Sequence, residues 1–483
     1  MKTVWPWLRT KLVWIGTGLL TLISLIAVIS IKLTHPYRPA FYLFAGYLDE
    51  QTKRDIDGRY SVKEYGDVNE FDFAIANQKA TAGITSDYLI VNLINEGKIA
   101  PISQEMRRLN GGLSPTTYLD FFTDEAQQQM QAFDQFITPT TQLRLQRQYP
   151  DYGPNYQFKF SDFVVPYFMN DQVYAFDTNK ILGQTFAPGA VPNPLGFAQV
   201  DAAGMPWAQS MVEAVATIVA KTTHNRPKIQ WIKNEIENTI LGSEYDGKPF
   251  STTLTNENYQ LWLDNFERMV TTATGHRMSD NSVNLFETDS DAILNNLIDP
   301  NARINIATLY NGDALDAYWG DDNFDGLESG DRLRFVRSRN SIRILDGFIV
   351  SSDISSANRL EVLQFFNYWL FDNVFKTKAE LETLYETTTQ ANANFYELPG
   401  MLRIFDFVNY TVSAKGIYEL LLEDYFIIED EQGDPVLDAA DQPVVDQIAL
   451  NLFKLSPQAQ PISPVDKELV SKLTTLFQQK ING

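Results

Sequence analysis

The stretch that most constrains the fold of this chain is Ile342–Val350, an apolar, β-branched run with one carboxylate, Asp346, in its middle. Such a run is typical of a strand buried on both faces of a sheet. A buried carboxylate must be paired or hydrogen-bonded, because desolvating it alone costs several kcal/mol. Asp346 is therefore a candidate site residue. From this run alone, an internal partner such as Arg343 or a turn at Asp346-Gly347 is the simpler explanation.

Apolar runs of strand character alternate with stretches of helical periodicity along the chain. The predicted strands are Phe41–Phe44, Ser61–Tyr65, Thr81–Thr85, Phe163–Tyr167, Val173–Phe176 and Ile304–Tyr310. Strands that alternate with helices predict an α/β fold with a mostly parallel sheet. With 483 residues, of which 44% are hydrophobic, the chain is long enough for two or three domains.

Three regions show weaker patterns. A polar helix is predicted over Ile229–Ile240 and an acidic hairpin over Glu429–Gln447. Residues 113–153 show no clear period beyond a helix at Glu125–Phe133.

The charge and the cysteine content exclude several classes of function. The 39 basic and 61 acidic residues give a net charge of −22, which repels nucleic acid and weakly favours cationic partners. The sequence contains no cysteine. Disulfides, thiolate metal sites, thiol catalysis and a lipid-modified cysteine are therefore excluded for these residues.

The N-terminal part of the chain resembles a membrane anchor. Residues 14–31 form an uncharged apolar run of about the length that spans a bilayer, and Lys2, Arg9 and Lys11 precede it. We predict that residues 1–37 are an uncleaved single-pass anchor and linker in the cell membrane, with the bulk of the chain outside the cytoplasm. A cleaved signal peptide is the alternative.

The sequence offers no convincing metal or cofactor site. Residues 321–326 place oxygen ligands and a glycine as an EF-hand loop does, but the twelfth position is Arg332 instead of a bidentate carboxylate. The three histidines lie far apart in sequence. We therefore expect no metal, no cofactor and no catalytic residue.

Several aromatic and polar residues fall at or just after predicted strand ends, where ligands bind in open α/β sheets. They are Phe44, Tyr47, Ser86, Tyr88, Tyr310 and Asp346. Each aromatic residue, taken alone, is more often part of a hydrophobic core.

The order of these pieces resembles the spermidine/putrescine-binding proteins of ABC transporters, a bilobal family of extracytoplasmic solute receptors. The segments that carry the resemblance are Phe41–Tyr47, Ser86–Tyr88, Asn92–Gly97, Val165–Tyr167, Phe176–Asn179, Leu309–Asp313 and Leu345–Gly347. The resemblance implies two α/β lobes around a ligand cleft: residues 38–164 with 347–408, and residues 165–346 with 409–483.

The resemblance also implies which side chains line the cleft. They are Phe44, Tyr47, Ser86, Tyr88, Tyr310, Asp346 and Tyr410, with Asp346 pairing with an ammonium group. The family has a central acidic motif with a second carboxylate three residues after an aspartate. The region matched to it, Asp201–Met205, keeps only Asp201, and Asp313 is the candidate that compensates.

The implied function is a solute-binding subunit of an ABC importer that captures a polyamine by lobe closure and works with permease subunits. A polyamine site needs carboxylates for the charges and aromatic faces for the methylene stem. The alternatives are a receptor of the same fold for another small solute, a surface hydrolase with paired carboxylates, and an adhesive surface protein.

Overall fold

The computed structural model describes residues 14, 17–26, 38–66, 68–320, 327–430 and 434–483. Of the predicted anchor, Trp14 and residues 17–26 are helical, while residues 15–16 and 27–37 lie outside the described residues. None of the described helices has both the length and the apolar character needed to cross a membrane. The EF-hand-like residues 321–326 also lie outside the described part.

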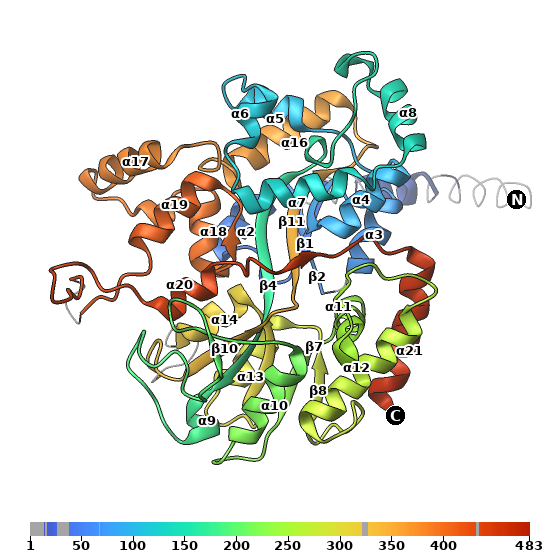
Figure 1. The fold of residues 1–483 in the computed structure, drawn as a ribbon. Coiled ribbons are helices and arrows are strands. Elements are labelled where there is room, and N and C mark those ends of the chain that lie inside the picture. Colours follow the sequence, from blue (N-terminus) through green and yellow to red (C-terminus); the bar gives the residue numbers. More distant parts are fainter. Residues whose placement is uncertain (1–13, 15–16, 27–37, 67, 321–326, 431–433) are drawn as a thin grey trace, which may run out of the picture.

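A mixed sheet, whose first three strands are parallel, forms the core of the half drawn uppermost in Figure 1, which we call the upper half. Its strands β1 (Ala40–Phe44), β2 (Ser61–Tyr65) and β3 (Ala82–Ser86) pair in parallel in the order β2-β1-β3. Helices α2 (Glu50–Asp57), α3 (Val68–Ala76) and α4 (Asp87–Glu96) follow them in turn. The predicted alternation of strands and helices is thereby confirmed for this half. The prediction of a mostly parallel sheet was wrong, because β11 (Ile342–Val350) pairs antiparallel with β3.

A second set of strands forms the core of the lower half (Figure 1). Strands β7 (Ile229–Ile232), β8 (Asn284–Glu287) and β9 (Ile306–Tyr310) pair in parallel, and β10 (Leu333–Ser338) lies on the other side of the long strand that joins the halves. The short strands β5 (Gln199–Val200) and β6 (Pro206–Ala208) extend this sheet.

The long strand β4 (Val165–Asp177) passes from one half into the other. Its first part pairs with β11 (Ile342–Val350), and its second part, from Gln172 onwards, pairs with β9. The prediction of two separate strands here was wrong. The polar residues Asn170 and Asp171 resemble a break in sequence, but they are buried and bonded at the crossing between the halves.

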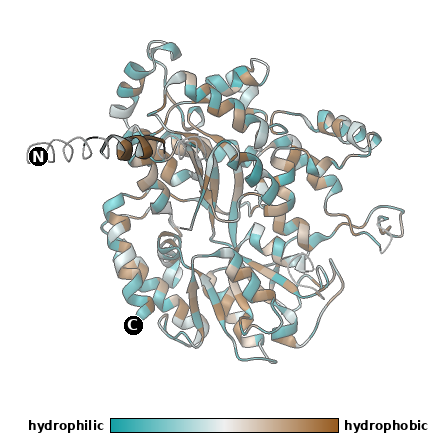
Figure 2. Cartoon of the chain, turned by 180° about the vertical axis from the view of Figure 1, so that it is seen from behind, coloured by the Kyte–Doolittle hydropathy of each residue, from teal (hydrophilic) through white to brown (hydrophobic). Residues whose placement is uncertain are grey.

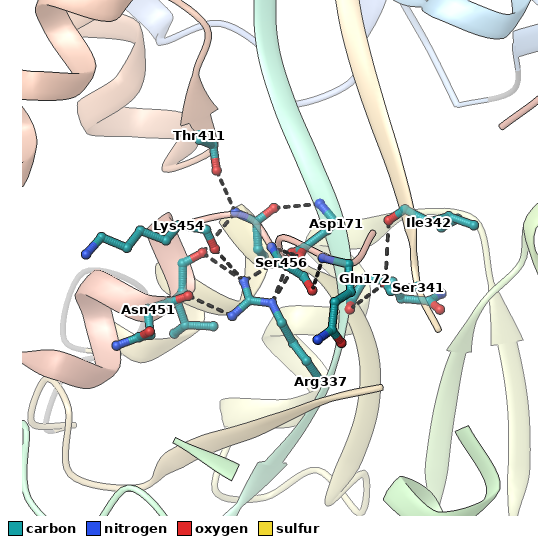
Figure 3. A network of polar contacts seen from close by, with 12 residues as sticks. Asp171, Gln172, Arg337, Ser341, Ile342, Thr411, Asn451, Lys454 and Ser456 are labelled. Carbon is teal, nitrogen blue, oxygen red and sulfur yellow. Dashed lines mark hydrogen bonds and ion pairs between the residues drawn. The ribbon is translucent and has the colours of Figure 1, made fainter. Parts of the chain in front are cut away.

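A buried polar network holds this crossing together (Figure 3). The guanidinium of Arg337 in β10 donates to both carboxylate oxygens of Asp171, at 3.0 and 3.1 Å. The same guanidinium donates to the backbone carbonyls of Asn451 and Lys454, and Ser456 N–H donates to Asp171. The C-terminal segment is thereby fixed to the crossing strands. The proposed lobe boundaries themselves remain a prediction.

Helices cover the outer faces of both halves. The remaining elements are α5 (Ser103–Leu109), α6 (Pro115–Leu119), α7 (Asp124–Asp134), α8 (Pro139–Gln148), α9 (Thr178–Leu182), α10 (Met211–Lys221), α11 (Glu235–Leu241), α12 (Tyr259–Thr274), α13 (Ser290–Ile298), α14 (Asn311–Tyr318), α16 (Ser356–Trp369), α17 (Lys378–Gln390), α18 (Met401–Val408), β12 (Thr411–Val412), α19 (Lys415–Asp424), α20 (Gln447–Phe453), β13 (Gln460–Pro461) and α21 (Lys467–Asn482).

Two of the weaker sequence patterns were misread. Residues 113–153 contain three α-helices. The sequence analysis missed α6 and α8, although Ser114-Pro115 and Thr138-Pro139 carry the N-cap and first-turn proline that mark a helix start. The predicted helix Ile229–Ile240 is instead the strand β7 followed by α11. Around residues 431–433, which are not described, the predicted acidic hairpin is present as bridges between Ile427 and Val445 and between Leu437 and Pro443.

Candidate functional site

A cavity of about 300 Å³ lies between the two halves, beside the crossing strands. The upper half contributes Phe44, Tyr47, Tyr65, Ser86, Tyr88 and, from β11, Asp346. The lower half contributes Asn234, Glu235, Glu237, Asp289 and Tyr310, while Tyr410 precedes β12 and Val470, Thr474 and Gln478 belong to α21. Seven of the nine residues named from the sequence therefore line one cavity.

Asp346 lines this cavity, and its carboxylate is hydrogen-bonded to three side chains. Its carboxylate accepts from Tyr47 Oη at 2.6 Å, from Ser86 Oγ at 2.7 Å and from Asn170 Nδ2 at 3.2 Å. The simpler explanation from the sequence, a pair with Arg343, is wrong, because Arg343 Nε donates to Gln129 instead. Burial raises the pKa of Asp346 to about 6, although the three hydrogen bonds favour the carboxylate.

The pairing of β11 with β4 is irregular at Asp346. The register between β11 and β4 shifts between Leu345 and Gly347, on either side of Asp346. A β-carbon on Gly347 would lie 2.0 Å from Val164 Cγ2, so only glycine allows this close approach. Bulges of this kind re-aim a side chain, which accounts for a carboxylate at the cavity in an otherwise apolar strand.

Glu237 is a second carboxylate of the cavity, and the sequence analysis missed it. It lies in the first turn of α11, where Oε1 accepts from Tyr310 Oη and from Asn234 Nδ2, both at 2.7 Å. Within the described structure, Oε2 is buried without a hydrogen-bond donor. Burial raises the pKa of Glu237 to about 8, opposed by the Tyr310 hydrogen bond and reinforced by the charges of Asp346 and Glu235.

Asp201, which the sequence analysis matched to the acidic motif, does not line the cavity. It is exposed in the turn between β5 and β6, and its Oδ1 accepts from the backbone N–H groups of Ala203 and Met205, each at 2.9 Å. Asn234 and Glu237, three residues apart in sequence, line the cavity instead. Recognising β7 as a strand would have located this pair.

Asp313 lies behind the cavity wall and does not line it. Its carboxylate accepts a short hydrogen bond from Tyr410 Oη, and burial raises its pKa to about 7. The ring of Tyr410 lies 5.3 Å from that of Tyr47 and packs directly on Gly312. Asp313 therefore orients a cavity tyrosine instead of supplying the charge that the sequence analysis expected of it.

The cavity combines aromatic faces with an excess of negative charge. Phe44 packs against Tyr47 and Tyr65, with ring centroids 5.4 and 4.5 Å apart. Among the described residues that line it, four are carboxylates (Glu235, Glu237, Asp289 and Asp346) and one is an ammonium (Lys233). Aromatic faces and carboxylates together suit a cationic ligand with an apolar stem.

The fold is similar to that of a solved structure from Synechococcus sp. MITs9220, described as a "putative oligosaccharide periplasmic-binding protein". The TM-score is 0.52 at 8% identity, and the match covers 92% of this chain and 94% of that one. At this identity the similarity shows the fold alone. Two α/β halves around a cavity are consistent with it.

Other comparisons are weaker. A protein of Listeria monocytogenes described as a "putative spermidine/putrescine ABC transporter" matches with a TM-score of 0.49 at 13% identity, covering 92% of this chain and 98% of that one. The substrate-binding protein PotD of Streptococcus pneumoniae matches with a TM-score of 0.47 at 12% identity, with the same coverage of both chains. At these scores we draw no argument from either.

At the level of sequence, the model of a family described as "Hypothetical lipoprotein (MG045 family)" matches residues 214–432, less than half of the chain. No curated protein matches the sequence significantly.

Proposed function

We propose that this chain is the solute-binding subunit of an ABC importer and that it captures a polyamine, such as spermidine or putrescine, by closing its two lobes on it. The observation that carries the proposal is the pair of buried carboxylates, Asp346 and Glu237, in one aromatic cavity between the halves. The proposal includes the lobes 38–164 with 347–408 and 165–346 with 409–483, and permease subunits as partners.

The charges of the cavity support a cation as the ligand. Both carboxylates have raised pKa values, since burial disfavours their ionised forms. An ammonium group between them would favour ionisation, so binding a cation would add an interaction that stabilises both carboxylates. The tyrosines bonded to these carboxylates, Tyr47 and Tyr310, would at the same time offer their ring faces to the methylene stem.

The proposed location is the outer side of the cell membrane, with the N-terminal segment as anchor. The described part of that segment is helical, apolar and exposed: Leu20 is 68% exposed and Ile23 56% exposed. Figure 2 shows it as a hydrophobic helix beside the body of the protein. Exposed apolar side chains gathered on one helix favour burial in a lipid or protein environment.

A thermal-unfolding panel tests the ligand. The full chain in detergent is heated with spermidine, putrescine, amino acids, sugars and phosphonates, and a ligand that binds the folded state at a hundred times its Kd adds about 2.7 kcal/mol of stability. We expect polyamines to raise the midpoint and Asp346→Asn to reduce the rise to about a third or less. A rise with an oligosaccharide alone would keep the fold and replace the ligand.

A surface hydrolase would require turnover and two convergent carboxylates in one cleft, and Asp346 and Glu237 line the same cavity. The panel therefore includes chromogenic glycosides, for which we expect no turnover. Sustained turnover that Glu237→Gln removes would overturn the receptor proposal.

A further inference from the structure

Helix α21 connects the two halves at one side of the cavity. It runs along the right-hand edge of the molecule in Figure 1, from the level of the upper half down the lower half. Its apolar residues Leu469, Leu473 and Phe477 are buried, and the ring of Phe477 packs edge-on against Phe286 of β8 at 5.7 Å. By its packing, α21 therefore belongs to the lower half.

The first residue of α21 is bonded to the upper half instead. Lys467 Nζ lies 2.8 Å from Asp72 Oδ1 of α3 and 2.8 Å from Glu96 Oε1 at the end of α4. Just before the helix, Asn92 Nδ2 of α4 donates to the carbonyl of Val465 at 3.0 Å. At the other end, Lys480 pairs with Asp264 and Glu267 of α12, within the lower half.

The face of α21 between these two ends lines the ligand cavity. Val470, Thr474 and Gln478, spaced by four residues and so on one face of the helix, are lining residues. Thr474 Oγ1 donates a short hydrogen bond to the carboxylate of Glu235, another lining residue. A helix that lines the cavity, packs on one half and is ion-paired to the other must shift relative to the upper half when the lobes separate.

We propose that α21 is a movable wall of the ligand cavity and that the ion pairs of Lys467 with Asp72 and Glu96 hold it shut. The role of α21 in ligand entry rests on the proposed function of solute binding. Because the lysine side chain is 43% exposed, its pairs are weak and screened by salt, which suits a contact that breaks and re-forms during transport.

The test measures opening directly and needs no ligand. The sequence contains no cysteine, so Leu143→Cys on α8 and Leu261→Cys on α12 give two unique sites for spin labels, one on each half, and both leucines are exposed. Pulsed electron resonance on the full chain in detergent then reports the distance between the halves. Lys467→Met keeps the apolar stem of the side chain and removes its charge, Lys467→Arg keeps the charge, and Lys480→Met removes a matched pair that stays within the lower half.

We expect Lys467→Met to enlarge the long-distance population about two- to fivefold in dilute buffer, and Lys467→Arg and Lys480→Met to leave it as in the parent. Added salt should move the parent towards Lys467→Met and leave Lys467→Met itself unchanged. Equal distance distributions for Lys467→Met and the parent, or an equal effect of Lys480→Met, would overturn the proposal. If a polyamine binds, Lys467→Met should release it about two- to fivefold faster. If no polyamine binds, the proposed function is wrong, but the distances between the spin labels still test whether the Lys467 ion pairs hold α21 shut.

Discussion

Replacing Glu237 with glutamine isolates the free-energy cost of burying this carboxylate. Burial raises the pKa of Glu237 from its ordinary value of 4.5 to about 8. Between these two pH values the folded protein binds more protons than the unfolded chain, so the free energy of unfolding falls as the pH rises. Integrated over the whole window, the loss is at most about 5 kcal/mol, and it is complete above pH 8.

Glu237→Gln removes this titration and keeps an oxygen that accepts from Tyr310. We expect the variant and the parent to differ little at pH 4.5, and the variant to be the more stable by up to about 5 kcal/mol at pH 8.5. Urea unfolding of the ligand-free protein at several pH values measures the difference, with Glu257→Gln, at an exposed site, as the control. Parallel pH profiles for Glu237→Gln and the parent would refute the reasoning.

Two further substitutions test the architecture around the cavity. Arg337→Met leaves Asp171 buried without its cation, and we expect a loss of about 3–5 kcal/mol in urea unfolding; a loss below about 1 kcal/mol would show that the crossing does not depend on this pair. Gly312→Ala places a β-carbon 2.3 Å from the ring of Tyr410, so it should cost about 1–3 kcal/mol and weaken ligand binding. Gly58→Ala, whose β-carbon would lie 3.5 Å from the carbonyl oxygen of Asp55, should do neither.

Three of the cavity residues, Phe44, Ser86 and Asp346, were predictable because they follow ordinary strand patterns. Phe44, Ser86 and Asp346 lie at the ends or in the middle of apolar runs that the sequence marks clearly, and the structure brings these three to one cavity. The partner of Asp346 was not predictable. Tyr47 was itself a candidate, but it lies 299 positions from Asp346 in sequence, and nothing in either segment indicates their hydrogen bond.

The part of the cavity formed by Glu237 and α21 was missed for two physical reasons. Glu237 follows a strand of only four residues, β7, whose apolar run merges with the next helix when read by periodicity. Helix α21 has the amphipathic pattern of an ordinary surface helix, and only its position in three dimensions puts Thr474 at the cavity. Similarly, the polar centre of β4 resembles a loop until its burial at the crossing is known.

Calorimetric titration of the purified full chain with spermidine tests the central proposal most directly. We predict one spermidine per chain, release of protons as the cavity carboxylates ionise, and at least about thirtyfold weaker binding to Asp346→Asn, since removing one partner of a buried charge pair costs about 2 kcal/mol or more. No heat with polyamines and clear binding of a neutral solute, or equal affinity of Asp346→Asn and the parent, would contradict the proposal.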